Sequence, residues 1–218
     1  MSSAKRIGVL ISGRGSNMAA LIEACKAPDY PAEIAIVISN RPGAPGLEMA
    51  AEAGIPAATI DHTAYPSREA FEAETDKALR EAKVDLICNA GFMRLLTESF
   101  VDQWRNRQLN IHPSLLPAFK GLNTHERALE AGVRIAGCTV HFVRSEMDSG
   151  PIIAQAAVPV LPGDTPDTLA ARVLKAEHEL YPLALKLVAS GAAQVQGERV
   201  IFADDSVAAT ALFAPQTA

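Results

Sequence analysis

The first half of the chain alternates short apolar runs with helical patterns. Strand-like runs of apolar, often β-branched residues occur at 7–11, 33–38, 57–60 and 84–89. Helical patterns lie between them, at about 17–26, up to about 53, and at 68–82. Ser67 suits the N-cap of the third helix, and Gly54 suits the C-cap of the second. Parallel strands need such helical crossovers, so this order predicts a parallel sheet with helices on both faces.

The second half follows a different rhythm. A strand near 108–111 leads into a proline-rich loop and then a helix from about 124 to 131. Strand-like runs at 137–143 and 151–160 are joined by R-S-E-M-D-S-G-P, which is too short for a helical crossover. Short links of this kind join antiparallel strands, so we expect a mixed sheet.

The last long helix begins at Thr165-Pro166, where a capping hydroxyl precedes a proline at the first helical position. Gly191 would end this helix, and Pro182 could kink it. A hairpin at about 194–202 would follow. The apolar stripe of the helix is formed by Leu169, Val173, Ala176, Leu180, Leu183 and Leu187.

These patterns predict an α/β fold. We expect a three-layer αβα arrangement around a mostly parallel, mixed sheet, with a Rossmann-like N-terminal half. A chain of 218 residues suits one such domain, and no repeat, linker or second core is evident. We assign a single domain to 1–205, with a nucleotide- and phosphate-binding half at 1–105 and a catalytic half at 106–205. An alanine-rich, loose tail would occupy 206–218.

The composition narrows the classes of protein. Net charge is −5 and charged residues make up 21% of the chain, so we expect no nucleic-acid partner. No apolar run reaches the roughly 18 residues of a membrane span, and the N-terminus fits a first strand better than a signal peptide. Three cysteines without a CxxC pair indicate a reducing compartment, and so a cytoplasmic protein. Cys88 and Cys138 fall in strands, where we expect buried thiols.

The segment I-S-G-R-G-S-N, at 11–17, follows a strand and opens a helix. Glycines let backbone N–H groups approach an anion, and a helix N-terminus favours negative charge. We therefore expect Gly15, Ser16 and Asn17 to bind a phosphate, although a ligand-free turn fits the same pattern. The third glycine of a dinucleotide fingerprint is missing, and no acid ends the second strand. Arg41 could meet a 2′-phosphate, which keeps an NADP-binding protein among the alternatives.

A second group of residues consists of Asn110, His112 and Asp148. Residues two apart in a strand share a face, so an amide and an imidazole would point together at the end of one strand. Two converging donors suit a developing oxyanion. Asp148, in the D-S-G-P turn, would favour the charged form of the imidazole and fix its orientation. We expect these three loops to meet at one edge of the sheet.

Two further features are less specific. The segment A-G-F-M-R-L-L, at 90–96, could form the wall of a pocket for a flat heterocycle or simply the entry of the next helix. Glu177 lies at the border of the apolar stripe of the last helix, from which it could face a cleft. The remaining histidines show no zinc-binding spacing, so we expect no metal; they are His62, His125, His141 and His178.

Taken together, these segments resemble the phosphoribosylglycinamide formyltransferases, folate-dependent enzymes of purine synthesis. The matching stretches, which span roughly 6–190, are V-L-I-S-G-R-G-S-N, S-N-R-P-G-A-P-G-L, A-G-F-M-R-L-L, L-N-I-H-P-S-L-L-P-A-F-K-G, H-F-V-R-S-E-M-D-S-G-P-I-I and R-V-L-K-A-E-H-E-L-Y-P. N-I-H-P-S-L-L-P with the later D-x-G-P is the specific signal for formyl transfer. One departure is Asn123, where family members often carry histidine.

The resemblance implies roles for individual residues. Asn110, His112 and Asp148 would be catalytic, and Glu177 would meet the glycyl end of the substrate. The catalytic half would bind 10-formyltetrahydrofolate as co-substrate, without a metal. The folate-binding residues would be Arg68, Met93, Arg94, Leu95, Leu96, Asn110, Arg144, Ser145, Glu146, Met147 and Asp148. Partners would be these small molecules, in a monomer or homodimer.

Three rival functions follow from shared motifs. A formyltetrahydrofolate hydrolase would use the same Asn, His and Asp, but that family usually adds an N-terminal regulatory domain. A methionyl-tRNA formyltransferase normally adds a C-terminal domain, and we expect this short, acidic chain to lack it. A non-catalytic nucleotide-binding module would use only the glycine loop and leaves the second group of residues unexplained.

Overall fold

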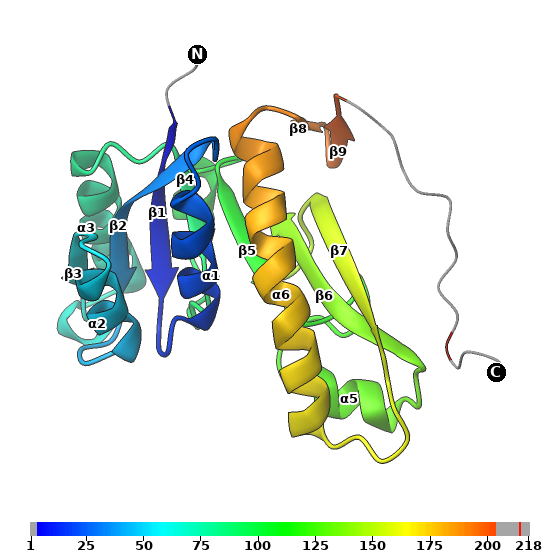
Figure 1. The fold of residues 1–218 in the computed structure, drawn as a ribbon. Helices are drawn as coiled ribbons and strands as arrows, with labels where there is room; N and C mark the ends of the chain where they lie inside the picture. The colour runs from blue at the N-terminus through cyan, green and yellow to red at the C-terminus, as the bar shows by residue number, and fades with distance from the viewer. Residues whose placement is uncertain (1–3, 204–213, 215–218) are drawn as a thin grey trace.

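The protein is described by a computed structural model that covers residues 4–203 and 214. In the first half, strands and helices alternate as predicted (Figure 1). The elements are β1 (Lys5–Ile11), α1 (Ser16–Cys25), β2 (Ala32–Ser39), α2 (Pro45–Glu52), β3 (Ala57–Thr59), the short 3-10 helix η1 (His62–Ala64), α3 (Arg68–Glu81), β4 (Leu86–Asn89) and α4 (Glu98–Gln103).

The second half contains more strand and one long helix. Its elements are β5 (Gln108–His112), α5 (Thr124–Glu130), β6 (Ile135–Phe142), β7 (Ile152–Pro159), α6 (Pro166–Ala189), β8 (Ala193–Gln196) and β9 (Arg199–Phe202). The predicted hairpin is present as β8 and β9, which pair antiparallel as a separate small sheet. The predicted loose tail lies almost entirely outside the described residues.

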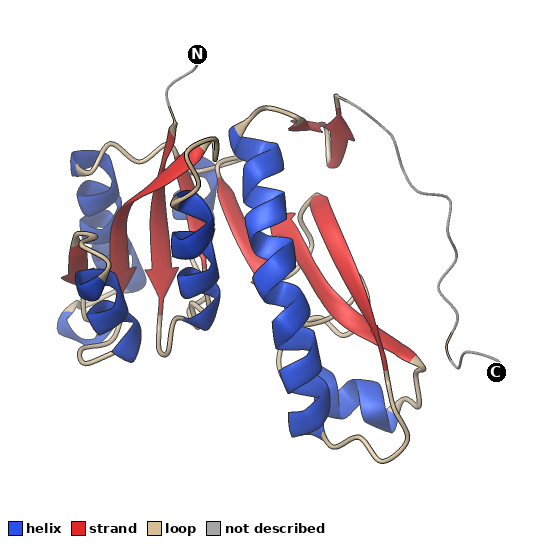
Figure 2. Cartoon of the chain, viewed as in Figure 1, coloured by secondary structure: helices blue, strands red, loops and turns tan. Residues whose placement is uncertain are grey.

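The main sheet has seven strands in the order β3-β2-β1-β4-β5-β6-β7. All pairs from β3 to β5 are parallel, whereas β6 runs antiparallel to both β5 and β7. The prediction of a mostly parallel, mixed sheet with surrounding helices is therefore confirmed (Figure 2).

Helix ends are set by the predicted capping residues. The Ser67 hydroxyl accepts a hydrogen bond from the N–H of Ala70, and the Thr165 hydroxyl accepts one from the N–H of Thr168. Gly54 and Gly191 adopt the left-handed conformation that terminates a helix, with φ of 71° and 80°. Helix α6 continues through Pro182. None of the helices in the described ranges is long and apolar enough to cross a membrane.

Two apolar clusters lie on the two faces of the sheet. One joins β1, β4, β5 and β6 to α1 and α6, and it includes Leu109, Val140 and Tyr181. The stripe predicted for α6 is buried there at Leu169, but the prediction was wrong for Leu183, which is 51% exposed. Cys88 and Cys138 are buried free thiols, as predicted.

The second cluster covers only part of the opposite face. It joins α3 and α4 to strands β1, β2 and β4, through residues such as Leu10, Ile38 and Ile87. Gln108 pairs with Ile87 and therefore shares its face, as Asn110 and His112 do by alternation. No side chain of β5, β6 or β7 belongs to this second cluster. In the described chain, this part of the face is contacted by loops instead of a helix.

Candidate active site

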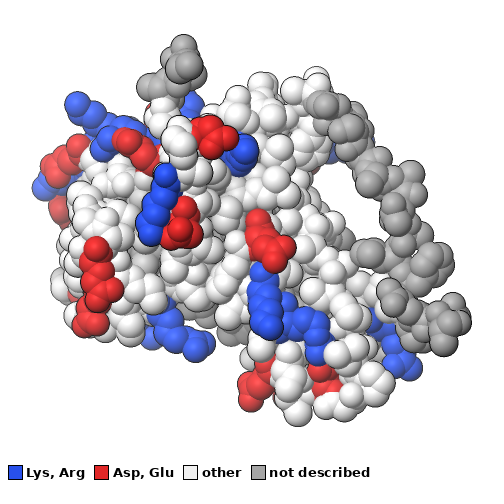
Figure 3. Space-filling view, in the orientation of Figure 1, with Lys and Arg blue, Asp and Glu red and all other residues white. Residues whose placement is uncertain are grey.

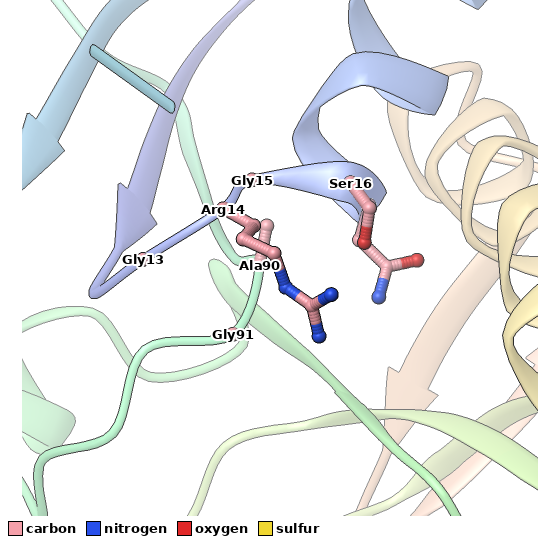
Figure 4. A pocket seen from close by; sticks show the side chains of 7 residues that line it. Gly13, Arg14, Gly15, Ser16, Ala90 and Gly91 are labelled. Carbon is pink, nitrogen blue, oxygen red and sulfur yellow. The ribbon is translucent and has the colours of Figure 1, made fainter. Parts of the chain in front are cut away.

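The glycine loop lies between β1 and α1. Gly15 is the residue before α1 and has φ of 74°, a left-handed conformation that glycine adopts without strain. A pocket of about 160 Å³ opens at this loop, lined by Gly13, Arg14, Gly15, Ser16, Asn17, Ala90 and Gly91. Figure 4 shows the Arg14 side chain extending from the loop into the same space that Ser16 faces. This arrangement places a cation and a helix N-terminus around a site suited to an anion.

Arg14 was not among the predicted binding residues. The sequence held the signal, because an arginine within a glycine loop before a helix adds a charge to the backbone donors. Gly46 was also missed. Its N–H donates to the carbonyl of Gly13 at 3.1 Å, and a Cβ at this position would lie 2.6 Å from Cδ1 of Ile11. The second glycine-rich segment therefore fixes the shape of the first.

Asn17 and Glu177 meet although 160 residues separate them. The Asn17 amide donates to a Glu177 carboxylate oxygen at 2.7 Å, and both residues are buried. Burial raises the pKa of the Glu177 carboxyl, and the Asn17 hydrogen bond opposes this only in part. The side-chain amide oxygen of Asn17, Oδ1, is buried and has no hydrogen-bond partner among the described residues. The two predicted substrate-binding groups thus form one polar site between α1 and α6.

His112 ends β5 and contacts Asp148 directly. The Nδ1 atom of His112 lies 3.3 Å from a carboxylate oxygen of Asp148, and both side chains are at most 10% exposed. Its Nε2 atom lies 3.0 Å from the carbonyl oxygen of Phe119. Each ring nitrogen therefore faces an acceptor, and only the doubly protonated imidazolium can donate to both.

Asp148 does not reach His112 at an edge of the sheet, so the prediction that three loops meet at one edge was wrong. Because β6 is antiparallel to β5, its last residue, Phe142, lies beside Leu109, at the amino end of β5. The loop 143–150 starts there, where the Val143 N–H donates to the carbonyl of Gln108. It then returns along the sheet face. The three residues meet over that face and not at one edge formed by strand ends.

His141 is a fourth member of the group, and sequence reasoning missed it. It pairs with Asn110 across the β5–β6 ladder, and its Nε2 lies 3.3 Å from the Asn110 amide nitrogen. Its Nδ1 lies 2.9 Å from the Phe142 carbonyl oxygen, and burial lowers its pKa. A neutral His141 that donates from Nδ1 can accept from Asn110 through Nε2, which orients the amide. The same Nε2 lies 3.7 Å from Asp148.

Asp148 is also held by the loop that follows His112. One of its carboxylate oxygens accepts from the N–H of Gly121 at 2.9 Å. The Arg127 guanidinium donates to the carbonyls of Lys120 and Leu122 and lies over the ring of Phe119. The 119–123 loop therefore contacts both the imidazole and the carboxylate, and α5 supports it.

The residues expected at the folate pocket are distributed over four segments, which are Arg68, the loop 93–96, Asn110 in β5 and the loop 144–148. Met93 and Leu95 are more than 60% exposed, and the Met93 N–H is tied to the Ser12 hydroxyl at 2.8 Å. Met147 is half exposed and Arg68 is exposed at the start of α3. The Arg144 guanidinium is turned to Glu198 and Asn106. Arg94, Leu96, Ser145 and Glu146 lie in the same two loops, and their folate role stays a prediction.

Outside these two sites we searched for metal-binding clusters and for charged patches. Among the described residues, no group of three or more His, Cys, Asp or Glu side chains is placed to hold a metal ion. Lys, Arg, Asp and Glu are interspersed on the face shown in Figure 3, without a continuous basic stripe there. The two polar sites described above are therefore the candidates for function.

Comparisons with known proteins identify the family of the chain. A family model described as formyl transferase matches residues 5–185. The trifunctional purine biosynthetic protein adenosine-3 of Gallus gallus is 56% identical over 190 residues, which cover 87% of this chain and 19% of that protein. The chain spans 14–19% of the length of the trifunctional relatives that it matches.

Two shorter relatives match over nearly their whole length. The phosphoribosylglycinamide formyltransferase of Escherichia coli (strain K12) is 45% identical, over 89% of this chain and 95% of that protein. The crystal structure of glycinamide ribonucleotide transformylase 1 from Symbiobacterium toebii superposes with a TM-score of 0.91 at 50% identity, over 94% of this chain and 96% of that chain. The chain belongs to the formyl transferase family, among the phosphoribosylglycinamide formyltransferases.

Proposed function

We propose that the chain transfers the formyl group of 10-formyltetrahydrofolate to the amine of N1-(5-phospho-D-ribosyl)glycinamide. The products are the N-formyl compound and tetrahydrofolate, a step of purine synthesis. The observation that carries the proposal is the contact of His112 with Asp148 beside Asn110, on a part of the sheet face that no described helix covers. We assign the reaction to the cytoplasm, with small molecules as the partners.

The chemistry follows from the donors at this site. The primary amine attacks the formyl carbon, and the carbonyl oxygen becomes an oxyanion. The Asn110 amide and the Nε2–H of His112 donate to this oxygen, with the Nε2–H exchanging its present acceptor, the Phe119 carbonyl. Asp148 holds the His112 ring in place through their 3.3 Å contact and accepts a proton from the attacking amine, directly or through water. The oxyanion then re-forms the carbonyl, the bond from carbon to folate N10 breaks, and N10 takes up the proton that the amine gave to Asp148.

The substrate that carries the amine binds at the glycine loop in this proposal. Gly15, Ser16 and Asn17 bind the ribose phosphate, with Arg14 adding a charge from the same loop. Glu177 meets the glycyl end of this substrate. The exposed apolar side chains of Met93, Leu95 and Met147 fit a wall for the folate. The remaining folate residues are Arg68, Arg94, Leu96, Asn110 and the loop 144–148.

The rival reaction is hydrolysis of the formyl group, in which water replaces the amine. Release of tetrahydrofolate from 10-formyltetrahydrofolate separates the two when it is followed with and without the glycinamide substrate. We expect release only when the amine is present. Equal release without the amine would make the chain a hydrolase. No release in either condition would favour a binding module.

The same assay on His112→Ala tests the site. Removing one donor to a developing oxyanion typically costs about 10²–10³-fold in rate, so we expect a loss of about this size. His62→Ala is the matched control, because His62 is bonded to Asn40 on another part of the sheet. If His112→Ala keeps the activity of the wild type, as His62→Ala should, a role for His112 is ruled out.

A further inference from the structure

Three segments distant in the sequence meet at Glu198, the residue before β9. One carboxylate oxygen of Glu198 accepts from Nε of Arg144 at 2.8 Å, and the other accepts from the Arg105 guanidinium at 2.7 Å. The same Arg144 donates to the side chain of Asn106 at 2.9 Å. The hairpin β8–β9 is thereby joined to the loop 143–150 and to the segment that enters β5.

The Arg144 side chain is held on every nitrogen of its guanidinium. Besides Glu198 and Asn106, it donates to the carbonyl of Val143 at 3.0 Å, and it is only 9% exposed. Two cations beside Glu198 keep the carboxyl ionised, since Arg144 first and then Arg105 lower its pKa. A planar guanidinium with three fixed partners has little freedom to rotate. Arg144 is an anchor point at the start of its loop.

The anchor point contacts the other end of the same loop. A Cβ at Gly150 would lie 3.2 Å from Cγ of Arg144 and 1.8 Å from the carbonyl oxygen of Phe142. Gly150 therefore packs directly against the start of the loop. Asp148 lies two residues earlier, in a left-handed conformation with φ of 52°. The position of the Asp148 carboxylate depends on how this closed loop sits on the sheet.

We propose that Glu198 is a positioning residue for Asp148, acting through Arg144. The inference rests on the proposed function, since it concerns the same carboxylate. The ion pair fixes the guanidinium, the guanidinium fixes both ends of the loop, and the loop places Asp148 against His112. Misplacement of a catalytic group by about 1 Å can cost on the order of 10²-fold in rate. A loosened loop should misplace the carboxylate less, so we expect the rate to fall by about 10-fold.

The test compares Glu198→Gln with Glu23→Gln. Glu23 is a matched control, because it is exposed and pairs with Lys26 at 2.6 Å, away from the site. We expect kcat for formyl transfer to fall about 10-fold in Glu198→Gln, with KM for the glycinamide substrate unchanged and no change in Glu23→Gln. A change confined to KM, or none at all, would overturn the proposal.

A double-mutant cycle distinguishes positioning from general weakening of the hairpin. In an Arg144→Gln background, Glu198→Gln should have little further effect on kcat, because the two residues act in series. Multiplication of the two single effects would show that Glu198 acts by another route and would overturn the proposal.

Amide hydrogen exchange tests the role of Glu198 without depending on formyl transfer. We expect the amides of 143–150 to exchange about 10-fold faster in Glu198→Gln, while those of α3 are unchanged. Unchanged exchange in the loop would overturn the anchor whatever the activity. Faster exchange in a protein without formyl transfer would support the anchor and reject only the proposed function.

Discussion

One face of the main sheet is treated differently in its two halves. Over β1, β2 and β4 it is apolar and covered by α3 and α4, with Leu10 and Ile87 among the buried residues. Over β5 and β6 the same face carries Gln108, Asn110, His112, Thr139 and His141. A covering helix excludes water but leaves no room for a substrate. Loops that fold back over a polar face bury it while keeping it able to open.

We expect the largest effect on turnover from neutralising one aspartate at the polar half of this face, compared with one in the helix-covered half. Asp148→Asn removes the carboxylate that faces His112, and we expect turnover to fall about 10²–10⁴-fold with the fold intact. Asp85→Asn is the control in the helix-covered half. The Asp85 side chain accepts from the N–H of Arg6 at 2.9 Å, away from His112, so turnover should be unchanged. Steady-state rates and circular dichroism of both variants check this. Similar losses would mean that the polar half has no special role.

A smaller effect comes from adding one methyl group to each half. In Gly150→Ala the new Cβ meets the Phe142 carbonyl, which is backbone and cannot move aside. We expect the 143–150 loop to shift and turnover to fall about 10²-fold. In Gly8→Ala the Cβ meets side-chain atoms alone, at 2.4 Å from Cδ2 of Leu79 and at 3.2 and 3.3 Å from the two methyl groups of Val84. That variant should lose about 1–3 kcal/mol of stability and keep its turnover. Equal turnover in the two would show that loop placement does not limit the rate.

The smallest effect concerns the other face of the sheet. Burial raises the pKa of Glu177, so the folded chain holds this proton more tightly than the unfolded chain. The stability of the protonated form is therefore present at acid pH and lost as the pH rises through the folded pKa. Glutamine avoids this loss. We expect the Tm of Glu177→Gln to exceed that of the wild type at about pH 8 and to equal it near pH 3.5. Thermal melts at both pH values provide the measurement, and a constant difference would contradict it.

The helix-covered half was predictable because its rules are local. Alternation of strand and helix, the Ser67 cap and Gly54 all act within a few residues. The strand positions of Asn110 and His112 followed from the same kind of reasoning. His141 did not, because its partnership with Asn110 depends on the register of an antiparallel pair.

The path of the 143–150 loop was missed for a related reason. Reversal of β6 sends this loop to the amino end of β5, and no local pattern reveals that direction. Gly46 escaped notice because its contact with Gly13 joins two separate loops. Residues that act through non-local contacts need a three-dimensional arrangement before their roles can be read.

The hydrogen bonds of the buried Tyr181 hydroxyl have a consequence for how the protein unfolds. It lies 3.1 Å from the Asn89 carbonyl oxygen of β4 and 3.2 Å from the Leu109 carbonyl oxygen of β5, the two strands where the halves join. The same helix reaches α1 through Glu177. Because these contacts join the two halves, we expect that neither half can unfold while the other stays folded. Calorimetric and van't Hoff enthalpies should therefore agree, as for a single cooperative unit.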